Sequence, residues 1–176
     1  MSTYQCEGIR CSISEIESHT SKKNVYGMQE NQVVFNGLVG FAEIELPVNE
    51  PVLAMSDNML SDNFLHVSNH LVEAIKKDTF TIYNAENAIF NLLIAPSVWL
   101  ILIRYLEKSG VGIFMSLTKK GFCIAVESAG LLQADLLKSV YKSDEPQRYF
   151  EAYQLIFTIL QMFCKRYQDS GYLIKS

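Results

Sequence analysis

The sequence predicts one α+β domain, in which an antiparallel sheet with a C-terminal hairpin packs on two long helices. The 176 residues are 49% hydrophobic and 19% charged, which is enough apolar material for a single core. Short β-prone segments fill residues 1–63, and helices with a hairpin between them fill residues 64–176. Strands and helices alternate without the regular βαβ rhythm of a parallel sheet.

The first segments of the chain are predicted to be strands. Alternation in residues 3–17 places Ile9, Cys11 and Ile13 on one face and predicts a strand. Residues 19–26 are polar and lysine-rich, which predicts a loop. The segment Gln32–Leu46 is strongly β-prone, with Ala42, Ile44 and Leu46 directed inward. Gly37 and Gly40 inside this segment predict a bulge or a bend.

Three short elements are predicted next. Residues Pro51–Met55 form a short strand, and Phe64–Lys76 carries apolar residues at helical spacing and predicts a helix. Thr79–Tyr83 alternates and predicts another strand.

A long apolar helix is predicted from Asn84, which has the side chain of a helix N-cap, to about Lys108, before Gly110. Pro96 lies inside it, where proline removes a backbone hydrogen bond. We therefore expect a kinked helix, or two helices broken at Ala95.

The clearest hairpin is predicted at Val111–Leu117 and Phe122–Glu127. Its turn is Lys119-Lys120-Gly121, and each strand has one apolar face. After a short helix at Leu131–Tyr141, a last helix is predicted from about Ser143 to Gln168. More than half of its circumference is apolar, which indicates either a core helix or a dimer interface. The apolar positions include Phe150, Tyr153, Ile156, Phe157, Leu160, Phe163, Cys164 and Tyr167.

One segment carries a family resemblance. FTIYNAENAIFNLLIAP, at residues 80–96, resembles a signature of the bacterial domain-of-unknown-function 3137 family, with Phe80, Tyr83 and Pro96 in register. The order of elements after it agrees, and Ile13-Ser14-Glu15 with Val34–Leu38 resembles an upstream region of that family. The resemblance implies a fold order that covers nearly the whole chain and matches the soluble part of its members. It implies no reaction.

The composition excludes several functional classes. A formal net charge of −4 offers no basic face for nucleic acid. The longest apolar stretch, Leu92–Ile103, is shorter than the roughly 20 residues of a membrane-spanning helix. The first ten residues do not resemble a secretory signal, and the four cysteines have no disulfide-scaffold spacing. We therefore expect a cytoplasmic protein with reduced thiols.

A metal site has one weak candidate. His66 and His70 are one helical turn apart, and Glu73 follows on the same side of the predicted helix. Imidazole and carboxylate groups bind zinc, but the sequence contains no HExxH glutamate and no fourth ligand is indicated. A pair of surface histidines is the alternative interpretation, and we expect no cofactor.

The cysteines show no nucleophile motif. Cys123 is predicted on the hairpin face opposite Phe122, and Cys164 on the apolar stripe of the last helix. Cys6 and Cys11 are five residues apart, which would place them on opposite faces of a regular strand. Ordinary packing explains all four thiols.

Aromatic residues offer a possible binding surface. Ten Phe, nine Tyr and one Trp make up 11% of the chain, with many of them on the long helices. They are expected either to pack in the core or to line a groove for a peptide or partner helix. The candidates for that groove are Tyr83, Trp99, Tyr105, Tyr153 and Tyr167.

The sequence therefore favours a non-catalytic binding or scaffolding domain that binds a protein partner or associates with itself through the last helix. Glycine-rich phosphate loops and nucleophile elbows are absent from the sequence. Two alternatives stay open. One is a hydrolase that uses a cysteine or a metal, and the other is a peripheral membrane module.

Overall fold

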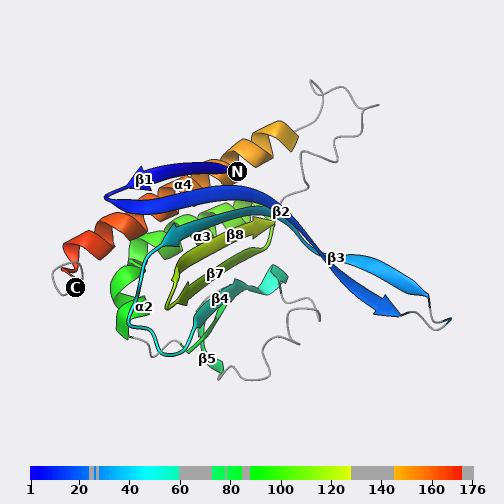
Figure 1. Cartoon of the computed structure of the whole chain (residues 1–176), viewed down its shortest axis with the longest axis horizontal. Coiled ribbons are helices and arrows are strands. Elements are labelled where there is room, and N and C mark those ends of the chain that lie inside the picture. The colour runs from blue at the N-terminus through cyan, green and yellow to red at the C-terminus, as the bar shows by residue number, and fades with distance from the viewer. Residues whose placement is uncertain are drawn as a thin grey trace.

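The computed structural model is built on an antiparallel sheet of eight strands, in the order β1-β2-β3-β8-β7-β4-β6-β5 (Figure 1). It describes residues 1–23, 26, 28–59, 73–77, 79–84, 88–127 and 145–171. The fold is thus α+β with an antiparallel sheet, as predicted. The strands are β1 Ser2–Cys6, β2 Ile9–Lys23, β3 Gln29–Glu43, β4 Val52–Ser56, β5 Glu73–Lys77, β6 Phe80–Tyr83, β7 Ile113–Thr118 and β8 Gly121–Glu127.

Three α-helices lie in the described part of the chain: α2 Ala88–Leu93, α3 Pro96–Ser109 and α4 Glu145–Asp169. A short 3-10 helix, η1, covers Asp57–Met59. The α-helices cover one face of the sheet (Figure 1). The prediction of two long helices and a C-terminal hairpin holds only in part. One C-terminal helix of 25 residues is present, and the β7–β8 hairpin lies in the middle of the sheet, between β3 and β4.

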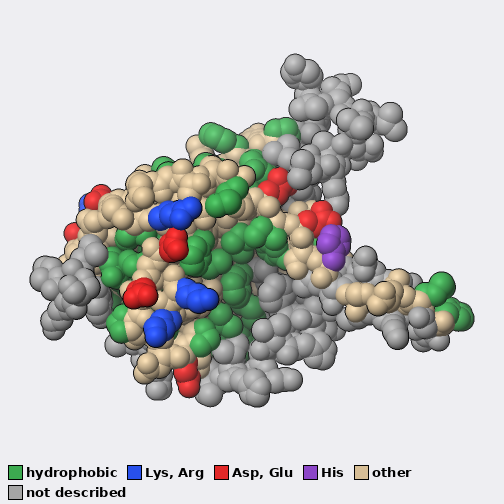
Figure 2. All heavy atoms as spheres, viewed as in Figure 1, with side chains coloured by type: hydrophobic (Ala, Val, Ile, Leu, Met, Phe, Trp, Pro, Cys, Tyr) green, Lys and Arg blue, Asp and Glu red, His purple; other side chains and the backbone are tan. Residues whose placement is uncertain are grey.

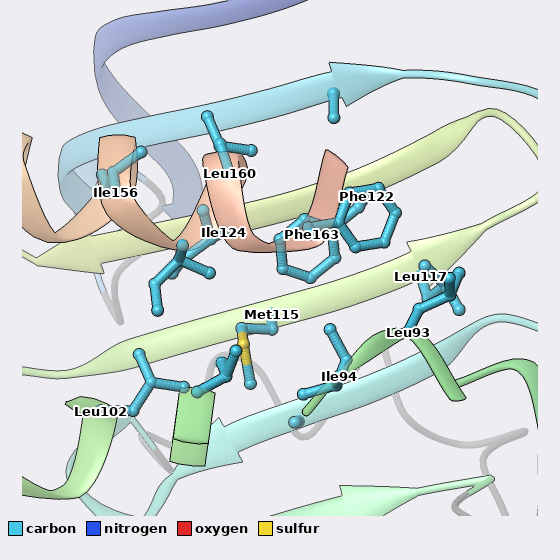
Figure 3. Close-up of a cluster of buried hydrophobic side chains, with 14 of the residues drawn as sticks. Leu93, Ile94, Leu102, Met115, Leu117, Phe122, Ile124, Ile156, Leu160 and Phe163 are labelled. Carbon is cyan, nitrogen blue, oxygen red and sulfur yellow. The ribbon is translucent and has the colours of Figure 1, made fainter. Parts of the chain in front are cut away.

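The core lies between the helices and the sheet face they cover. Alternate residues of the β7–β8 hairpin point into it, as predicted, and are fully buried. Figure 3 shows Met115 and Ile124 of this hairpin facing Leu102 of α3 and Ile156 of α4. The buried hairpin residues are Ile113, Met115, Leu117, Phe122, Ile124 and Val126.

The predicted break in the long helix is confirmed. Ala95 has the extended backbone expected before a proline, and Pro96 begins α3, where a missing N–H removes no helical hydrogen bond. Gly110 ends α3 with φ 66°, and its N–H donates to the Leu106 carbonyl over 2.8 Å.

Two predictions for the first strands were wrong. The chain reverses at Glu7 and Gly8, which have φ of 51° and 78°, so residues 3–17 form parts of two strands instead of one. Most of the predicted loop at 19–26 is strand, because β2 continues to Lys23 in register with Gln29 of β3. Polarity indicated a loop, but pairing with β3 decides the structure.

The glycines of β3 do not form the predicted bulge. The register shifts instead between Ser18 and His19, opposite Phe35 and Val33. Gly40 has another role, because a Cβ at this position would overlap Ile156 of α4. The close approach of α4 to the sheet therefore requires glycine here.

Predictions in the middle of the chain had mixed outcomes. Strands β4 and β6 agree with the segments predicted at 51–55 and 79–83. The predicted helix at 64–76 is wrong at its end, because Glu73–Lys77 pairs with β6 as strand β5, and the rest of that helix lies outside the described residues. Asn84 has the left-handed φ of 58° instead of the extended backbone usual at an N-cap, and its Nδ2 donates to the Pro51 carbonyl over 2.8 Å, whereas residues 85–87 lie outside the described residues.

The end of the chain agrees with the sequence more closely. Helix α4 runs almost over the predicted range, whereas the predicted short helix at 131–141 lies outside the described residues. Phe150, predicted on the apolar stripe, is instead 59% exposed. None of the described helices has the length and apolar character needed to cross a membrane.

Candidate functional site

Three of the five aromatic candidates are core residues. Trp99 is 5% exposed and packs edge to face against Phe80 of β6 and Phe90 of α2, with ring centroids 5.4 and 6.2 Å away. Tyr83 and Tyr167 are also buried. The structure therefore does not place these three side chains on an open groove.

The other two aromatic candidates, Tyr105 on α3 and Tyr153 on α4, are half-buried. Burial, and next the charge of Glu151, raise the pKa of Tyr105 on α3. The hydroxyl of Tyr153 on α4 lies 3.2 Å from Oγ of Ser2 on β1. These tyrosines contribute to contacts between α4 and its neighbours and do not converge on one cleft.

The predicted metal site is not brought together in the described structure. His66 and His70 lie outside the described residues, and Glu73 is on strand β5 instead of a helix. Within the part of the chain that the structure covers, no group of three His, Cys, Asp or Glu side chains is arranged to hold a metal ion.

Cys123 has the environment of an unreactive thiol. It lies on β8, on the sheet face away from the helices, opposite Ser116 of β7. Burial raises the pKa of this thiol to about 11, against a smaller opposing effect of a hydrogen bond with Ser116. Since the thiolate is the nucleophile, Cys123 is poorly suited to attack a substrate near neutral pH.

The other three cysteines converge, which the sequence did not predict. The reversal at Glu7 and Gly8 places Cys6 of β1 and Cys11 of β2 on the same face of the sheet, against Cys164 of α4. The Sγ atoms of Cys11 and Cys164 are 3.6 Å apart. Both side chains are fully buried, whereas Cys6 is partly exposed. We call Cys6, Cys11 and Cys164 the thiol cluster.

The thiol cluster has coupled acid–base properties. The contact with Cys164 lowers the pKa of the Cys11 thiol, burial opposes this, and the nearby hydroxyl of Tyr4 lowers it further. The pKa of Cys164 is raised, because the same bond retains its proton and burial disfavours its charge. Burial also raises the pKa of Cys6, although a hydrogen bond with Cys164 acts in the opposite direction.

Strand β1, which carries Cys6 of the thiol cluster, lies along α4 (Figure 1). Tyr4 stacks at a tilt on Phe157, with ring centroids 5.0 Å apart, and the Gln168 side chain donates to the Glu7 carbonyl. The α4 residues that contact β1 or the turn after it are spaced by four or seven positions and therefore lie on one face of the helix. They are Tyr153, Phe157, Cys164 and Gln168.

A surface pocket of about 520 Å³ lies where α2 and α3 meet the end of α4. Its charged groups have both signs, and Nε of Arg166 donates to the Leu92 carbonyl over 2.6 Å. Arg166 therefore helps to hold α2, and the pocket shows no single preference for ligand charge. The lining residues are Leu92, Ala95, Ser97, Met162, Lys165, Arg166, Asp169 and Ser170.

The most prominent surface feature is an arm formed by Glu17–Lys23 of β2 and Gln29–Asn36 of β3. In these two ranges the described strands pair only with each other, because β3 meets β8 from Gly37 onward and β1 meets β2 only up to Ile13. Figure 1 shows the arm extending beyond the rest of the sheet. At its root, Phe35 is buried against Ala125 of β8.

Apolar side chains are exposed along the arm and in the turn at its end. Figure 2 shows hydrophobic side chains at its tip. Their exposed fractions lie between 41% and 83%, for Ile16 beside the root, Val33 on β3, and Met28 and Tyr26 near the turn. A monomer gains no stability from such exposure, and gathered apolar side chains are typical of contact surfaces.

Searches among protein-family models, curated proteins and solved structures found no match to this chain. The resemblance to the domain-of-unknown-function 3137 family therefore stays a prediction.

Proposed function

We propose that this chain is a non-catalytic binding or scaffolding domain, and that the arm of β2 and β3 is its contact element. The observation that carries the proposal is the arm itself, a two-stranded ribbon that no third described strand flanks. Within the part of the chain that the structure describes, no backbone group pairs with its outer N–H and C=O groups, so an extended partner segment would add there as a further strand. Exposed side chains such as Val33 would give such pairing its side-chain contacts.

The partner that fits the arm is a protein with an extended segment or a sheet edge. Main-chain hydrogen bonds supply affinity in this mode, and pockets for alternate side chains supply specificity. The cytoplasmic location expected from the sequence belongs to the same proposal.

Photo-cross-linking in the source cells tests this function. A photoreactive benzoylphenylalanine is placed at Val33 on the arm and, as the matched control, at Gln154 on the exposed side of α4. We expect discrete cross-linked products from position 33 and none of the same mass from position 154. Equal labelling at both positions, or no product from position 33, would contradict the proposal.

A second copy of the chain is a further candidate partner, through the end of α4. Phe150 is 59% exposed there, although the remaining apolar stripe of α4 packs in the chain's own core. Sedimentation equilibrium of the full chain tests this contact. We expect a concentration-dependent dimer that Phe150→Ser weakens, and a monomer at every concentration would exclude it.

A hydrolase that uses Cys123 has less support. A catalytic cysteine needs a lowered thiol pKa and a base within hydrogen-bond reach. Burial instead raises the pKa of Cys123, and the side chain opposite it is Ser116.

A further inference from the structure

Two buried thiols from opposite ends of the chain are in contact. Cys11 and Cys164 are 153 residues apart in sequence, yet their Sγ atoms are 3.6 Å apart inside the core. A disulfide requires about 2.05 Å between sulfur atoms. A combined approach of about 1.5 Å, which side-chain rotation can contribute, would therefore close the bond.

The surroundings of this pair favour a thiolate at Cys11. The two Sγ atoms lie within hydrogen-bond distance, and the pKa of the Cys11 thiol is lowered first by Cys164 and then by the Tyr4 hydroxyl on β1. Among the described residues, no hydrogen-bond partner lies within normal distance of that buried hydroxyl, so it is free to donate to a sulfur that moves toward it. Burial raises the pKa of Tyr4, so this hydroxyl keeps its proton and stays a donor. A thiolate is the species that attacks sulfur in thiol–disulfide exchange.

Cys6 connects the pair with the solvent. It is partly exposed and close enough to Cys164 for each thiol to shift the pKa of the other, whereas Cys11 and Cys164 are fully buried. A dissolved oxidant therefore meets Cys6 first.

We propose that the thiol cluster is a redox-modification site, in which Cys6 reacts with a hydroperoxide and a reversible disulfide then forms between Cys11 and Cys164. This site is independent of the binding function of the arm. It adds a covalent state of the protein that links β2 to α4.

The first step makes a sulfenic acid. The Cys6 thiolate attacks one oxygen of the hydroperoxide, an S–O bond forms, and the O–O bond breaks. The released alkoxide takes a proton and leaves as an alcohol, or as water when the oxidant is hydrogen peroxide. Because burial raises the pKa of Cys6, little thiolate is present at neutral pH and this step is slow.

Two exchange steps follow. The Cys164 sulfur attacks the Cys6 sulfur, an S–S bond forms, the S–O bond breaks, and the hydroxyl leaves as water with the Cys164 proton. The Cys11 thiolate then attacks Cys164 and releases Cys6, which takes up the proton that Cys11 has lost. In sum, two thiols lose two electrons and two protons, and one hydroperoxide is reduced to an alcohol and water.

Peptide mapping of the wild-type protein is the decisive experiment. The reduced chain is treated with hydrogen peroxide, free thiols are alkylated, and the digest is analysed by mass spectrometry. We expect one linked peptide pair that joins Cys11 to Cys164, with Cys6 and Cys123 alkylated, and full reversal by dithiothreitol. The long closed loop should also raise Tm by about 5–10 °C without reductant.

Other products would overturn the proposal. They are four alkylated cysteines, a Cys6–Cys164 disulfide as the final species, and sulfinic or sulfonic acid at Cys6 without any cross-link. None of these results depends on a variant that has to fold.

Two variants test the order of events. Cys6→Ser leaves the buried pair intact and should slow peroxide-driven cross-linking at least tenfold. Cys123→Ser changes a partly exposed thiol on the opposite face of the sheet and should leave the rate unchanged. Cross-linking of Cys6→Ser at the wild-type rate would refute the entry role of Cys6.

Discussion

The carboxylate of Glu127, at the end of β8, is half-buried. Its Oε2 accepts a hydrogen bond from the Gly112 N–H over 3.2 Å. Burial raises the pKa of this carboxyl above its usual value, although the Gly112 hydrogen bond acts in the opposite direction. The folded protein therefore holds the proton more tightly than the unfolded chain. This contribution to stability is fully present below the unfolded-state pKa, and it is lost as the pH rises through the raised folded-state pKa.

Glu127→Gln should remove that pH dependence. The amide oxygen of glutamine can still accept the hydrogen bond, but the side chain no longer ionises. We expect the variant to be more stable than wild type at pH 7.5, by at most about 0.5 kcal/mol because solvent screens a half-exposed group. The two proteins should be equally stable below about pH 4. Urea unfolding at both pH values measures this difference.

Glu107→Gln on the exposed side of α3 is the control for this prediction. It removes one negative charge from a site without the partly buried hydrogen bond to Gly112. A Glu127→Gln protein less stable than wild type at pH 7.5 would show that the ionised carboxylate stabilises the fold.

Helix α4 is the element that joins the parts of the molecule. It contacts β1, β2, β3 and β8 of the sheet as well as α2 and α3. Lys108 of α3 and Glu151 of α4 are linked by an ion pair of 2.9 Å, and an exposed pair of this kind adds little stability. Packing of the buried face of α4, which includes Ile156 and Leu160, supplies most of the attachment.

Gly40→Ala tests how closely α4 is packed. The added methyl group would overlap Cγ2 of Ile156 and lie 3.0 Å from Cδ1 of Leu160, so the helix or the strand has to move. We expect a loss of about 2–3 kcal/mol in the free energy of unfolding, which is typical of overpacking. Urea denaturation of the variant and the wild type measures it.

A matched control and a rescue separate overlap from backbone strain. At Gly110 an added Cβ meets no atom within 4 Å, but φ is 66°, so Gly110→Ala should cost only about 1 kcal/mol.

Ile156→Ala removes the overlapping methyl group, so its cost and that of Gly40→Ala should not add in the double variant. Full additivity would show that Gly40 and Ile156 do not compete for space.

Local signals account for the elements that the sequence predicted well. The β7–β8 hairpin was predictable because its alternation and its turn at Lys119–Lys120 lie within a few residues of each other. The break before Pro96 follows from the chemistry of proline. The reversal at Glu7 and the extension of β2 to Lys23 depend on pairing with other strands, and polarity alone indicated something else.

The candidate sites were harder to predict, for the same reason. Cys11 and Cys164 come together only through the packing of β2 on α4, so no sequence spacing indicates their contact. Glu7-Gly8 between two alternating runs was the one local signal that places Cys6 and Cys11 on one face. The sequence is compatible with Trp99 in the core or in a groove, and only tertiary packing, which leaves it 5% exposed, distinguishes the two positions.

At the scale of the whole molecule, the arm differs from the rest of the described fold, which we call the body, in what stabilises it. The body combines a sheet with helices and has a continuous buried core. The arm consists of two strands that pair with each other, and such a ribbon has only marginal stability of its own. The partner binding that we propose gives the arm a role separate from the folding of the body.

Shortening the arm tests this separation. A variant in which Asn-Gly replaces residues 19–34 joins Ser18 to Phe35, which already face each other across β2 and β3, through a two-residue hairpin turn. Because the arm adds little to the core, we expect Tm to change by no more than about 3 °C and unfolding to stay cooperative. Circular dichroism during heating measures both. The same variant should keep the Cys11–Cys164 contact, which peroxide mapping reports. A large fall in Tm would instead make the arm part of the folding unit and remove the reason for treating it as a binding element.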